Sequence, residues 1–243
     1  MKVNPQHFVR VLELASAKYE IDPVTLNFTE EGVVFNRVNA PETMLAVGKV
    51  KTTLFKDYQP IGEVTLDSKT IKKLKKMFKA DDYIEIRKSG NEIIFEGAKE
   101  QFVVPMTVSV LKPVDTSVIE QTPYGIVLKK PKPLRAVKID ITELDIEYED
   151  VIVIDYSENI LKVESTVAGS KYVKKIAPAS IVDLGDYHSK PKVMLDGETL
   201  ESIVDALKDV VWIVFTEGPV SISYSSNTLA LELTYIVSER VVT

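Results

Sequence analysis

The feature that most constrains the fold is an internal repeat in the 243-residue sequence. The segment VTLDSKTIKKLKKMF (64–78) aligns with VMLDGETLESIVDAL (193–207), 129 positions later. Each copy joins a strand-like stretch ending in Leu-Asp to apolar residues at helical spacing, which predicts a strand followed by a helix. Asp67 (or Ser68) and Asp196 stand where a helix N-cap is expected. The pattern predicts one supersecondary unit used twice.

Two further blocks repeat in the same order. VTLNFTEEGVVF (24–35) resembles VIVIDYSENILKV (151–163), and each predicts a strand, an acidic turn and a second strand. KVNPQHF (2–8) resembles LKKPKPL (128–134), which predicts helices over 5–19 and 131–144 that begin at proline. Strands follow the later helix of each half. We therefore predict an α+β fold made of two β-α-β-β-β-α-β-β-β halves.

The join between the halves lies around SVLKPVDTSVIEQTP (109–123), whose polar and proline-interrupted segments show no sustained periodicity. A segment of this kind is typical of a linker. We therefore predict an N-terminal repeat over 1–111, a connecting loop over 112–123 and a C-terminal repeat over 124–243.

The predicted helix at 68–78 has an unusual charge pattern for a chain whose net charge is −6. Its apolar residues share one face, and four lysines occupy the opposite face: Lys69, Lys72, Lys73 and Lys76. Like charges on adjacent turns repel by tenths of a kcal/mol, and a run that serves only solubility usually interleaves Glu. The pattern favours a polyanionic partner over a merely solvated face.

The other predicted helices differ in charge. The helices over 5–19 and 131–144 are expected to present some positive charge, at Arg10, Lys18, Lys132 and Arg135. The fourth predicted helix, over 198–208, is acidic on its outer face, with Glu198, Glu201 and Asp205. A uniformly basic surface is therefore not expected.

The sequence offers little material for catalysis. It contains no cysteine and two histidines, which excludes disulfides and zinc–thiolate sites. No phosphate-binding glycine loop is present, and no nucleophile is paired with a general base, so we expect neither an enzyme nor a cofactor. DLGDYH (183–188) places Asp183, Asp186 and His188 close together; we interpret it as a solvated loop, and a divalent-metal site is the alternative.

The chain has no pattern of a membrane or secreted protein. No apolar run approaches the roughly 20 residues of a membrane span. The N-terminal segment MKVNPQHFVRVLEL lacks the basic, apolar and small-residue regions of a secretory signal. We expect an intracellular protein.

The ordered set of motifs resembles the proliferating cell nuclear antigen (PCNA) family of DNA sliding clamps over essentially the full length. LNFTEEGVVFNRVNAPETMLAV resembles the family's F-[ST]-x-[ED]-G-[IV] region, and VTLDSKTIKKLKK resembles its strand-and-helix segment. FVVPM resembles the F-x-x-P-L strand that precedes the linker, and LTYIVSER resembles the C-terminal L-x-[FY]-[LY]-[LI]-A-P-[RK] segment.

The resemblance implies a non-enzymatic processivity factor for DNA polymerase. In the family three two-repeat subunits close a ring, helices line a hole around duplex DNA, and sheets form the outside. Lysines that meet phosphates bind without reading bases, which suits a protein that slides. The DNA contacts implied here are Lys69, Lys72, Lys73, Lys76, Arg10, Lys18, Lys132 and Arg135.

The resemblance also implies protein partners, namely DNA polymerase, flap endonuclease, DNA ligase, a clamp loader and other clamp subunits. Short client peptides are expected at Val118 and Ile119 of the connecting loop and at the residues beneath it: Val38, Leu45, Pro219 and Ile236. The alternative is that the last four are plain core residues. Subunits are expected to pair the strand at 101–109 with the strand at 171–177, through Val103, Val104, Met106, Tyr172, Val173 and Lys174.

Three departures from the family pattern bear on these expectations. Ser238-Glu239 replaces the family's Ala-Pro, the fourth predicted helix is acidic, and the basic KYVKKIA (171–177) has no equally acidic counterpart in QFVVPMTVS (101–109). The departures favour a heterotrimer, as in archaea whose rings contain different subunits, over a homotrimer. They also support an alternative function, a clamp-like scaffold with weak or no DNA loading. The expected compartment is the cytoplasm and nucleoid of an archaeon or the nucleus of a eukaryote.

Overall fold

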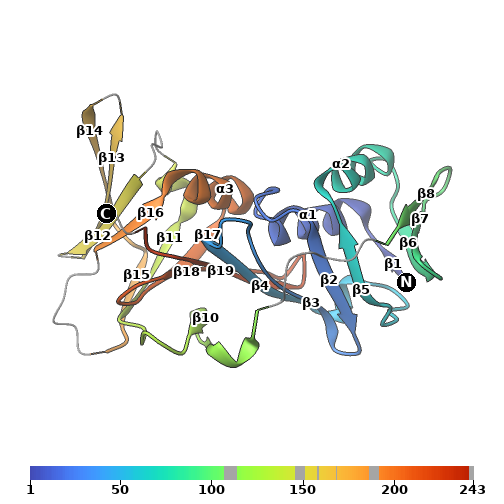
Figure 1. Ribbon diagram of the computed structural model, residues 1–243, viewed down its shortest axis with the longest axis horizontal. Helices are drawn as coiled ribbons and strands as arrows, with labels where there is room; N and C mark the ends of the chain where they lie inside the picture. The colour runs from blue at the N-terminus through green and yellow to red at the C-terminus, as the bar shows by residue number, and fades with distance from the viewer. Residues whose placement is uncertain (107–113, 146–150, 158, 168, 186–191, 241–243) are drawn as a thin grey trace. The chain divides into compact units, whose positions relative to one another are not determined.

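The computed structural model describes residues 1–106, 114–145, 151–157, 159–167, 169–185 and 192–240 (Figure 1). The fold is α+β, as predicted, with three α-helices among the described residues and mostly antiparallel strands. The chain divides into two compact units. Unit 1 comprises Met1–Asn39, Ala46–Val114 and Ser225–Glu232, and unit 2 comprises Ala40–Leu45, Asp115–Tyr224 and Leu233–Thr243.

Unit 1 contains two helices and two arrays of antiparallel strands, in the orders β1-β6-β7-β8 and β4-β3-β2-β5. α1 and α2 contact each other (Figure 1). The elements in chain order are β1 (Lys2–Val3), α1 (Pro5–Ala15), β2 (Val24–Thr29), β3 (Gly32–Val38), β4 (Met44–Val50), η1 (Thr52–Leu54), β5 (Gly62–Leu66), α2 (Ser68–Met77), β6 (Ile84–Ser89), β7 (Glu92–Glu96) and β8 (Gln101–Pro105). Four strands, rather than the predicted three, separate the two helices.

Local signals set the ends of α1. The Asn4 side chain accepts hydrogen bonds from the N–H groups of the first turn, and Pro5 occupies the first helical position, where its missing N–H costs nothing. The helix ends at Ala15, short of the predicted boundary, because the chain then enters the left-handed region, with φ of 55° at Lys18 and 86° at Tyr19.

The helix predicted at 68–78 is confirmed as α2. The Asp67 carboxylate accepts from the Thr70 N–H at 2.7 Å, and the hydrogen bonds from Thr70 lower the pKa of Asp67. Ile71, Leu74 and Phe78 are buried, as their spacing predicted. The other face of α2 is left for charged side chains.

Unit 2 contains the strand orders β14-β13-β12-β16 and β15-β11-β17-β18-β19, and the hairpin of β9 and β10. α3 packs against β16 and η3. The elements are η2 (Thr116–Val118), β9 (Ile119–Thr122), β10 (Gly125–Leu128), β11 (Arg135–Asp140), η3 (Ile141–Leu144), β12 (Val151–Ser157), β13 (Ile160–Val167), β14 (Ser170–Ile176), β15 (Ser180–Asp183), β16 (Lys192–Asp196), α3 (Gly197–Leu207), β17 (Val210–Phe215), β18 (Val220–Ser226) and β19 (Leu231–Val237).

The two blocks predicted from the repeat are present in unit 2. Asp196 caps α3 by accepting from the Thr199 N–H at 2.9 Å, as Asp67 does for α2. β12 and β13 pair as a hairpin, Ser157 opposite Ile160, and correspond to β2 and β3, which pair Thr29 opposite Gly32.

The helix predicted over 131–144 is wrong. Arg135–Asp140 form strand β11, and only Ile141–Leu144 form a 3-10 turn, which Asp140 caps by accepting from the Thr142 N–H. Val137, Ile139 and Ile141 are buried at every second position, so the spacing is that of a strand. The segment that repeats KVN at 2–4 is therefore KID at 138–140, and KKPKPL (129–134) is an irregular connection between β10 and β11.

The later part of the predicted connecting loop is regular. β9 pairs with β10 in the register Ile119 opposite Leu128 and Thr122 opposite Gly125. Gly125 has a φ of 118°, and a Cβ there would lie 1.8 Å from the Ser223 hydroxyl oxygen, so the turn requires glycine. Residues 112 and 113 of the expected loop lie outside the described residues.

Candidate nucleic-acid interface and partner-binding surfaces

The exposed face of α2 carries the four predicted lysines. Lys69, Lys72, Lys73 and Lys76 are all exposed, on the side of α2 opposite Ile71 and Leu74. None of the four forms an ion pair within 4.0 Å with another described residue. Four ammonium groups on about three turns of one helix are therefore exposed, and none is held in a close ion pair with a described carboxylate.

Two aromatic rings position the central lysines. The Lys72 Nζ lies 4.5 Å from the centroid of the Tyr19 ring, and the Lys73 Nζ lies 4.3 Å from that of Phe102. An ammonium over a ring face is attracted by the ring quadrupole. The aliphatic part of the lysine side chain covers apolar surface, and the ammonium group remains solvated. The rings therefore reduce the freedom of these lysines without cancelling their charge.

A fifth lysine ties α2 to α1. The Lys75 Nζ lies 2.7 Å from a Glu13 carboxylate oxygen, and the Tyr19 hydroxyl donates to the same carboxylate at 3.3 Å. Burial, and secondly the charge and hydrogen bond of Glu13, raise the pKa of Tyr19 to about 12. The Glu13 carboxylate is thus occupied by Lys75 and Tyr19, where α1 meets α2.

The structure places the predicted basic residues of the first helix in unit 1 with α2. Arg10 lies on α1 and is half-buried, whereas Lys18 is exposed in the turn after α1 rather than on the helix. α1 contacts α2, so Arg10 lies on a helix that packs beside the one with the four lysines, and Lys18 follows that helix.

Lys132 and Arg135 do not lie on a helix, contrary to the prediction. Arg135 is on β11, its side chain is 13% exposed, and its Nε donates to Asp183 at 2.6 Å. The guanidinium also lies 4.6 Å from the ring of Tyr156. Arg135 therefore stabilises unit 2 from within, and Lys132 is exposed in the connection that precedes β11.

The exposed face of α3 is acidic, as predicted. Glu198 and Glu201 are exposed, and Asp205 forms an ion pair of 3.5 Å with Lys208. Lys208 adopts φ 48° at the C-cap, where a positive charge also favours the carbonyl end of the helix. α3 therefore offers no counterpart to the lysine face of α2.

The residues predicted to bind client peptides differ in accessibility. Val118 is 45% exposed, and Ile119 and Pro219 are half-buried in unit 2. Leu45 and Ile236 are 7% and 5% exposed, so the alternative of core packing describes them in this structure. Val38, in unit 1, is half-buried.

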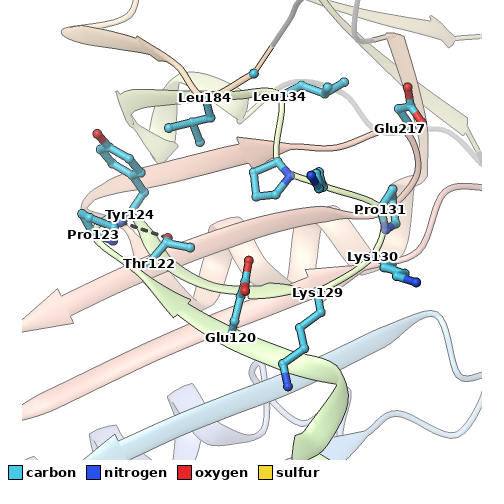
Figure 2. A pocket seen from close by; sticks show the side chains of 13 residues that line it. Glu120, Thr122, Pro123, Tyr124, Lys129, Lys130, Pro131, Leu134, Leu184 and Glu217 are labelled. Atoms are coloured by element: carbon cyan, nitrogen blue, oxygen red, sulfur yellow. Dashed lines mark hydrogen bonds between the residues drawn. The ribbon is translucent and has the colours of Figure 1, made fainter.

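Unit 2 also contains a pocket of about 1010 Å³ that the sequence did not predict (Figure 2). It lies between the β9–β10 hairpin and the proline-rich connection to β11, and the side chains in Figure 2 come from both. Its lining is Glu120, Thr122, Pro123, Tyr124, Lys129, Lys130, Pro131, Lys132, Pro133, Leu134, Leu184, Gly185 and Glu217. Lys132 is thus part of this pocket, and none of the six predicted peptide-binding residues lines it. The signal that could have indicated it is KKPKPL, because prolines hold a connection away from regular pairing.

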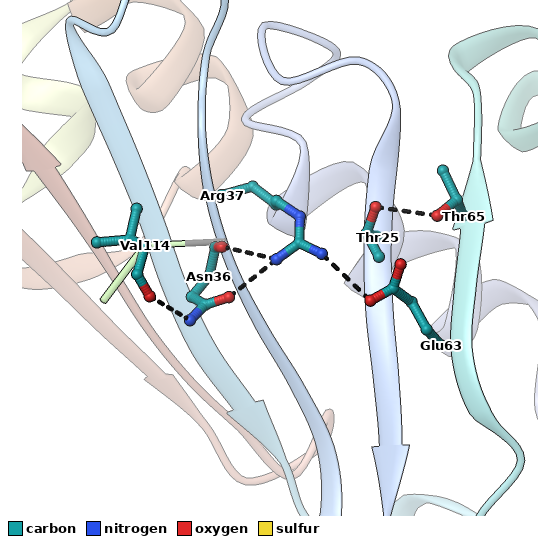
Figure 3. Close-up of polar contacts among 6 residues, drawn as sticks. All are labelled: Thr25, Asn36, Arg37, Glu63, Thr65 and Val114. Carbon is teal, nitrogen blue, oxygen red and sulfur yellow. Dashed lines mark hydrogen bonds and ion pairs between the residues drawn. The ribbon is translucent and has the colours of Figure 1, made fainter. Parts of the chain in front are cut away.

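A polar cluster in unit 1 holds the start of the connecting segment (Figure 3). The Asn36 amide donates to the Val114 carbonyl at 3.2 Å, and the Arg37 guanidinium bonds Asn36 and, at 3.5 Å, Glu63. Arg37 is 7% exposed, and burial lowers its pKa while the charge of Glu63 raises it. The Arg37 Nε has no hydrogen-bond partner among the described residues. β3 therefore fixes Val114 where the chain leaves unit 1.

Five of the six residues predicted at the subunit interface lie on two edge strands, β8 in unit 1 and β14 in unit 2, and Met106 follows β8. Val103 is 40% exposed on β8, and Tyr172 and Val173 are 46% and 41% exposed on β14. Met106 and Lys174 are half-buried, and Val104 is buried on the core side of its sheet. The accessible members of the predicted set are therefore Val103, Tyr172 and Val173.

The described residues include no group of three His, Asp or Glu side chains that could hold a metal ion. Of the predicted metal alternative, Asp183 is paired with Arg135, and Asp186 and His188 lie outside the described residues. Across the parts of the chain that the structure covers, no helix has the length and apolarity needed to cross a membrane.

Comparisons with known proteins find a likeness in structure and none in sequence. No protein-family model matches the chain, and no curated protein matches it. PCNA from Thermococcus kodakaraensis superposes with a TM-score of 0.77 at 17% identity, over 99% of each chain. The PCNA2–PCNA3 complex of Sulfolobus tokodaii gives 0.76 at 15% identity, over 98% of each chain. A. fulgidus PCNA, determined with the C-terminal region of FEN-1, gives 0.73 at 12% identity, over 100% of this chain and 98% of the other.

These structures match the chain over its whole length, so the likeness concerns both units rather than a shared fragment. The resemblance seen in the sequence motifs is confirmed at the level of structure: the chain has the PCNA sliding-clamp fold.

Proposed function

We propose that the protein is a DNA sliding clamp, a non-enzymatic processivity factor that encircles duplex DNA. The observation that carries the proposal is the exposed lysine face of α2, on which Lys69, Lys72, Lys73 and Lys76 have no carboxylate partner among the described residues. Ammonium groups held at a helix surface attract phosphates by releasing counterions, without reading bases. Arg10, on the helix that packs beside α2, and Lys18, which follows that helix, extend the proposed contact.

The proposal is restricted at the second repeat. Lys132 keeps an exposed ammonium and remains a proposed DNA contact from a loop, but Arg135 is withdrawn because its guanidinium is engaged by Asp183 and Tyr156. We retain the division into repeats over 1–111 and 124–243 with a connecting segment over 112–123. α3, with exposed Glu198 and Glu201, contributes no phosphate contact in this proposal.

Client enzymes are proposed to bind through short peptides at the connecting segment. The exposed Val118 and the half-buried Ile119 and Pro219 of unit 2 support this proposal, because accessible apolar side chains can mark a partner site. The FEN-1 peptide bound to A. fulgidus PCNA is the precedent for a flap endonuclease as a client. DNA polymerase, DNA ligase and a clamp loader are the other proposed partners. The proposed compartment is wherever the DNA is replicated.

Retention on circular DNA tests the proposal. The protein is loaded onto nicked plasmid with the clamp loader of the same source and ATP, and the complex is separated from free protein by gel filtration. A topological clamp stays on the circle and is lost when a restriction enzyme linearises the plasmid. Equal loss from circular and linear DNA would instead support the alternative function, a clamp-like scaffold for protein contacts.

A matched pair of variants connects this experiment to α2. Replacing Lys69, Lys72, Lys73 and Lys76 by Glu is expected to abolish retention. Replacing Lys2, Lys56, Lys99 and Lys192, which are exposed outside α2, by Glu gives the same net charge and is expected to preserve it. Equal retention by both variants would remove the lysine face from the proposed mechanism.

A further inference from the structure

The chain leaves unit 1 at Val114, and a side chain of β3 holds it there. The Asn36 Nδ2 donates to the Val114 carbonyl at 3.2 Å, within unit 1 (Figure 3). The next residue, Asp115, begins unit 2, and its side chain caps the short 3-10 turn that follows. That turn ends at Val118, which is the most exposed of the predicted client contacts. The anchor therefore stands four residues before the side chain proposed to meet client peptides.

The orientation of the Asn36 amide is decided by the groups at its two ends. The Arg37 Nη1 donates at 3.0 Å to the Asn36 Oδ1 and at 3.0 Å to the Asn36 backbone carbonyl. A guanidinium only donates and a carbonyl only accepts, so the amide has to turn its oxygen to Arg37 and its nitrogen to Val114. An amide turned the other way would set donor against donor and acceptor against acceptor. Arg37 therefore fixes the direction of the hydrogen bond that holds Val114.

Arg37 itself is poorly placed to stabilise unit 1. Its side chain is 8% exposed, burial lowers its pKa, and its Nε has no hydrogen-bond partner among the described residues. The neighbouring carboxylate of Glu63 is 54% exposed and 3.5 Å away, so the pair recovers little of the cost of burying the charge. An incompletely paired buried charge is often no more stabilising than an apolar side chain of similar size. What the guanidinium orients explains its presence better than what it stabilises.

We propose that Arg37 is a positioning residue for the client-peptide surface. By orienting Asn36 it keeps Val114 in place, so the short span that leads to Val118 starts from a fixed point. The proposal rests on the proposed function in assigning Val118 to client binding. The other end of the span is held as well, because the Val118 carbonyl accepts from the Lys129 N–H at 2.9 Å. A span fixed at both ends gives up less conformational freedom when it binds a peptide, so loss of the anchor should weaken binding.

Endoproteinase Asp-N tests the anchor directly, because it cuts the Val114–Asp115 bond, whose carbonyl Asn36 holds. Arg37→Met removes the guanidinium and keeps a side chain of similar length. The full-length variant should be cut at this bond about fivefold faster than the wild type, which is the change expected for the loss of one hydrogen bond of typical strength. The masses of the two fragments identify the cut. An unchanged rate overturns the proposal.

A matched control separates the anchor from the general effect of removing an arginine. Arg87→Met makes the same substitution in unit 1, at an exposed position of β6. It removes an ion pair of 3.4 Å with Glu96 and should leave the rate of the cut unchanged. Equal acceleration by Arg87→Met and Arg37→Met also overturns the proposal.

Two further measurements separate positioning from stabilisation. Urea denaturation should give Arg37→Met the midpoint of the wild type or a higher one, since the variant loses a poorly paired buried charge. Asn36→Leu should speed the cut as much as Arg37→Met does, and the double variant should be cut no faster than either, because both act through one hydrogen bond. Additive effects, or a lower urea midpoint that accounts for the faster cut, would make Arg37 a structural residue and overturn the proposal.

Peptide binding tests the consequence for clients. The probe is the C-terminal region of the flap endonuclease from the same source, labelled for fluorescence anisotropy; the A. fulgidus complex is its precedent. Arg37→Met and Asn36→Leu remove no proposed peptide contact, and each should weaken binding about fivefold, whereas Arg87→Met should not. Faster cutting with unchanged peptide affinity overturns the link to client binding. A wild-type chain that does not bind this peptide would refute the proposed client surface, and the cutting rates would still decide whether Arg37 positions Val114.

Discussion

α2 and α3 are the two repeat-related helices of the chain, and they share their construction. An aspartate caps each N-terminus and accepts from the N–H of a threonine three positions on, at 2.7 Å in α2 and 2.9 Å in α3. Each buries an apolar stripe at the same spacing, with Ile71 and Leu74 in one and Leu200 and Ile203 in the other. Their exposed faces nevertheless carry opposite charge, four lysines on α2 and two glutamates on α3.

The difference shows that two sets of positions are under separate constraints. Caps and apolar spacing decide whether a helix forms and which face it buries, so they are shared. Surface charge contributes tenths of a kcal/mol per pair to the helix but controls attraction to a polyanion over several ångströms. A clamp that used both helices equally would carry lysines on both, so unit 1 is expected to supply most of the attraction to DNA.

Removing the lysine face is expected to have the largest effect. Replacing Lys69, Lys72, Lys73 and Lys76 by Ala should lower the affinity for a short duplex on the order of 100-fold at low salt, because about four counterion-releasing contacts are lost. The dependence of log K on log salt should become shallower by about 3.6. Fluorescence anisotropy over a salt series measures both, and an unchanged slope would show that the lysines do not meet phosphates.

Making α3 resemble α2 should have the opposite and smaller effect. Glu198→Lys with Glu201→Lys removes two repulsive charges and adds two attractive ones, so duplex affinity should rise about tenfold and the salt slope should steepen by up to about 2. Glu31→Lys with Glu42→Lys, at exposed positions outside the helices, is the matched control. If the control raises affinity as much as the α3 variant, the effect is one of net charge and not of the helix.

The comparison of α2 and α3 also shows what sequence could predict. Both helices, their caps and their buried faces follow from residues within one segment, and all were predicted correctly. The prediction of a helix at 131–144 was wrong because Val137 and Ile141 are four residues apart. That spacing puts two residues on one face of a helix, and it also puts them on one face of a strand, where every second residue points the same way. Pairing with β17 and β15 decides the matter, and no local signal reports that pairing.

The functional surfaces also divide into features that one segment can predict and features that depend on contacts between distant segments. The lysine face is local to α2, and so it could be predicted. The engagement of Arg135 by Asp183, 48 residues away, could not. The pocket in unit 2 joins the β9–β10 hairpin to Leu184 and Glu217, which are distant in sequence, so KKPKPL could indicate only one of its walls.

The two N-caps should be nearly equivalent in stability. Asp67→Ala and Asp196→Ala should each lower the free energy of unfolding of their region by about 1 kcal/mol, measured by urea denaturation with hydrogen exchange to locate the loss.

The lowered pKa of Asp67 adds a pH test. A carboxyl with a depressed folded-state pKa stabilises above its unfolded pKa, so the penalty of Asp67→Ala should disappear as the pH falls through the folded value. Asp67→Asn, which can still accept the hydrogen bond, is the control; a penalty that persists in acid would mean that the charge is not involved.

The smallest expected effect concerns the seam that α2 has with α1. Tyr19 should titrate near pH 12, because burial and then Glu13 oppose its ionisation and raise its pKa. The difference in absorbance between the wild type and Tyr19→Phe over a pH series measures this titration. Since the folded-state pKa is raised, the stabilisation is complete below pH 10 and is lost as the pH rises through the range from 10 to 12.

Glu13→Gln removes the neighbouring charge and should lower the pKa of Tyr19, and it should also release Lys75, whose ammonium then adds to the lysine face. The variant should therefore bind duplex DNA slightly more tightly and with a steeper salt dependence. If the pKa falls while DNA binding is unchanged, Lys75 lies outside the contact, and the positive surface of α2 is confined to the four lysines that α3 lacks.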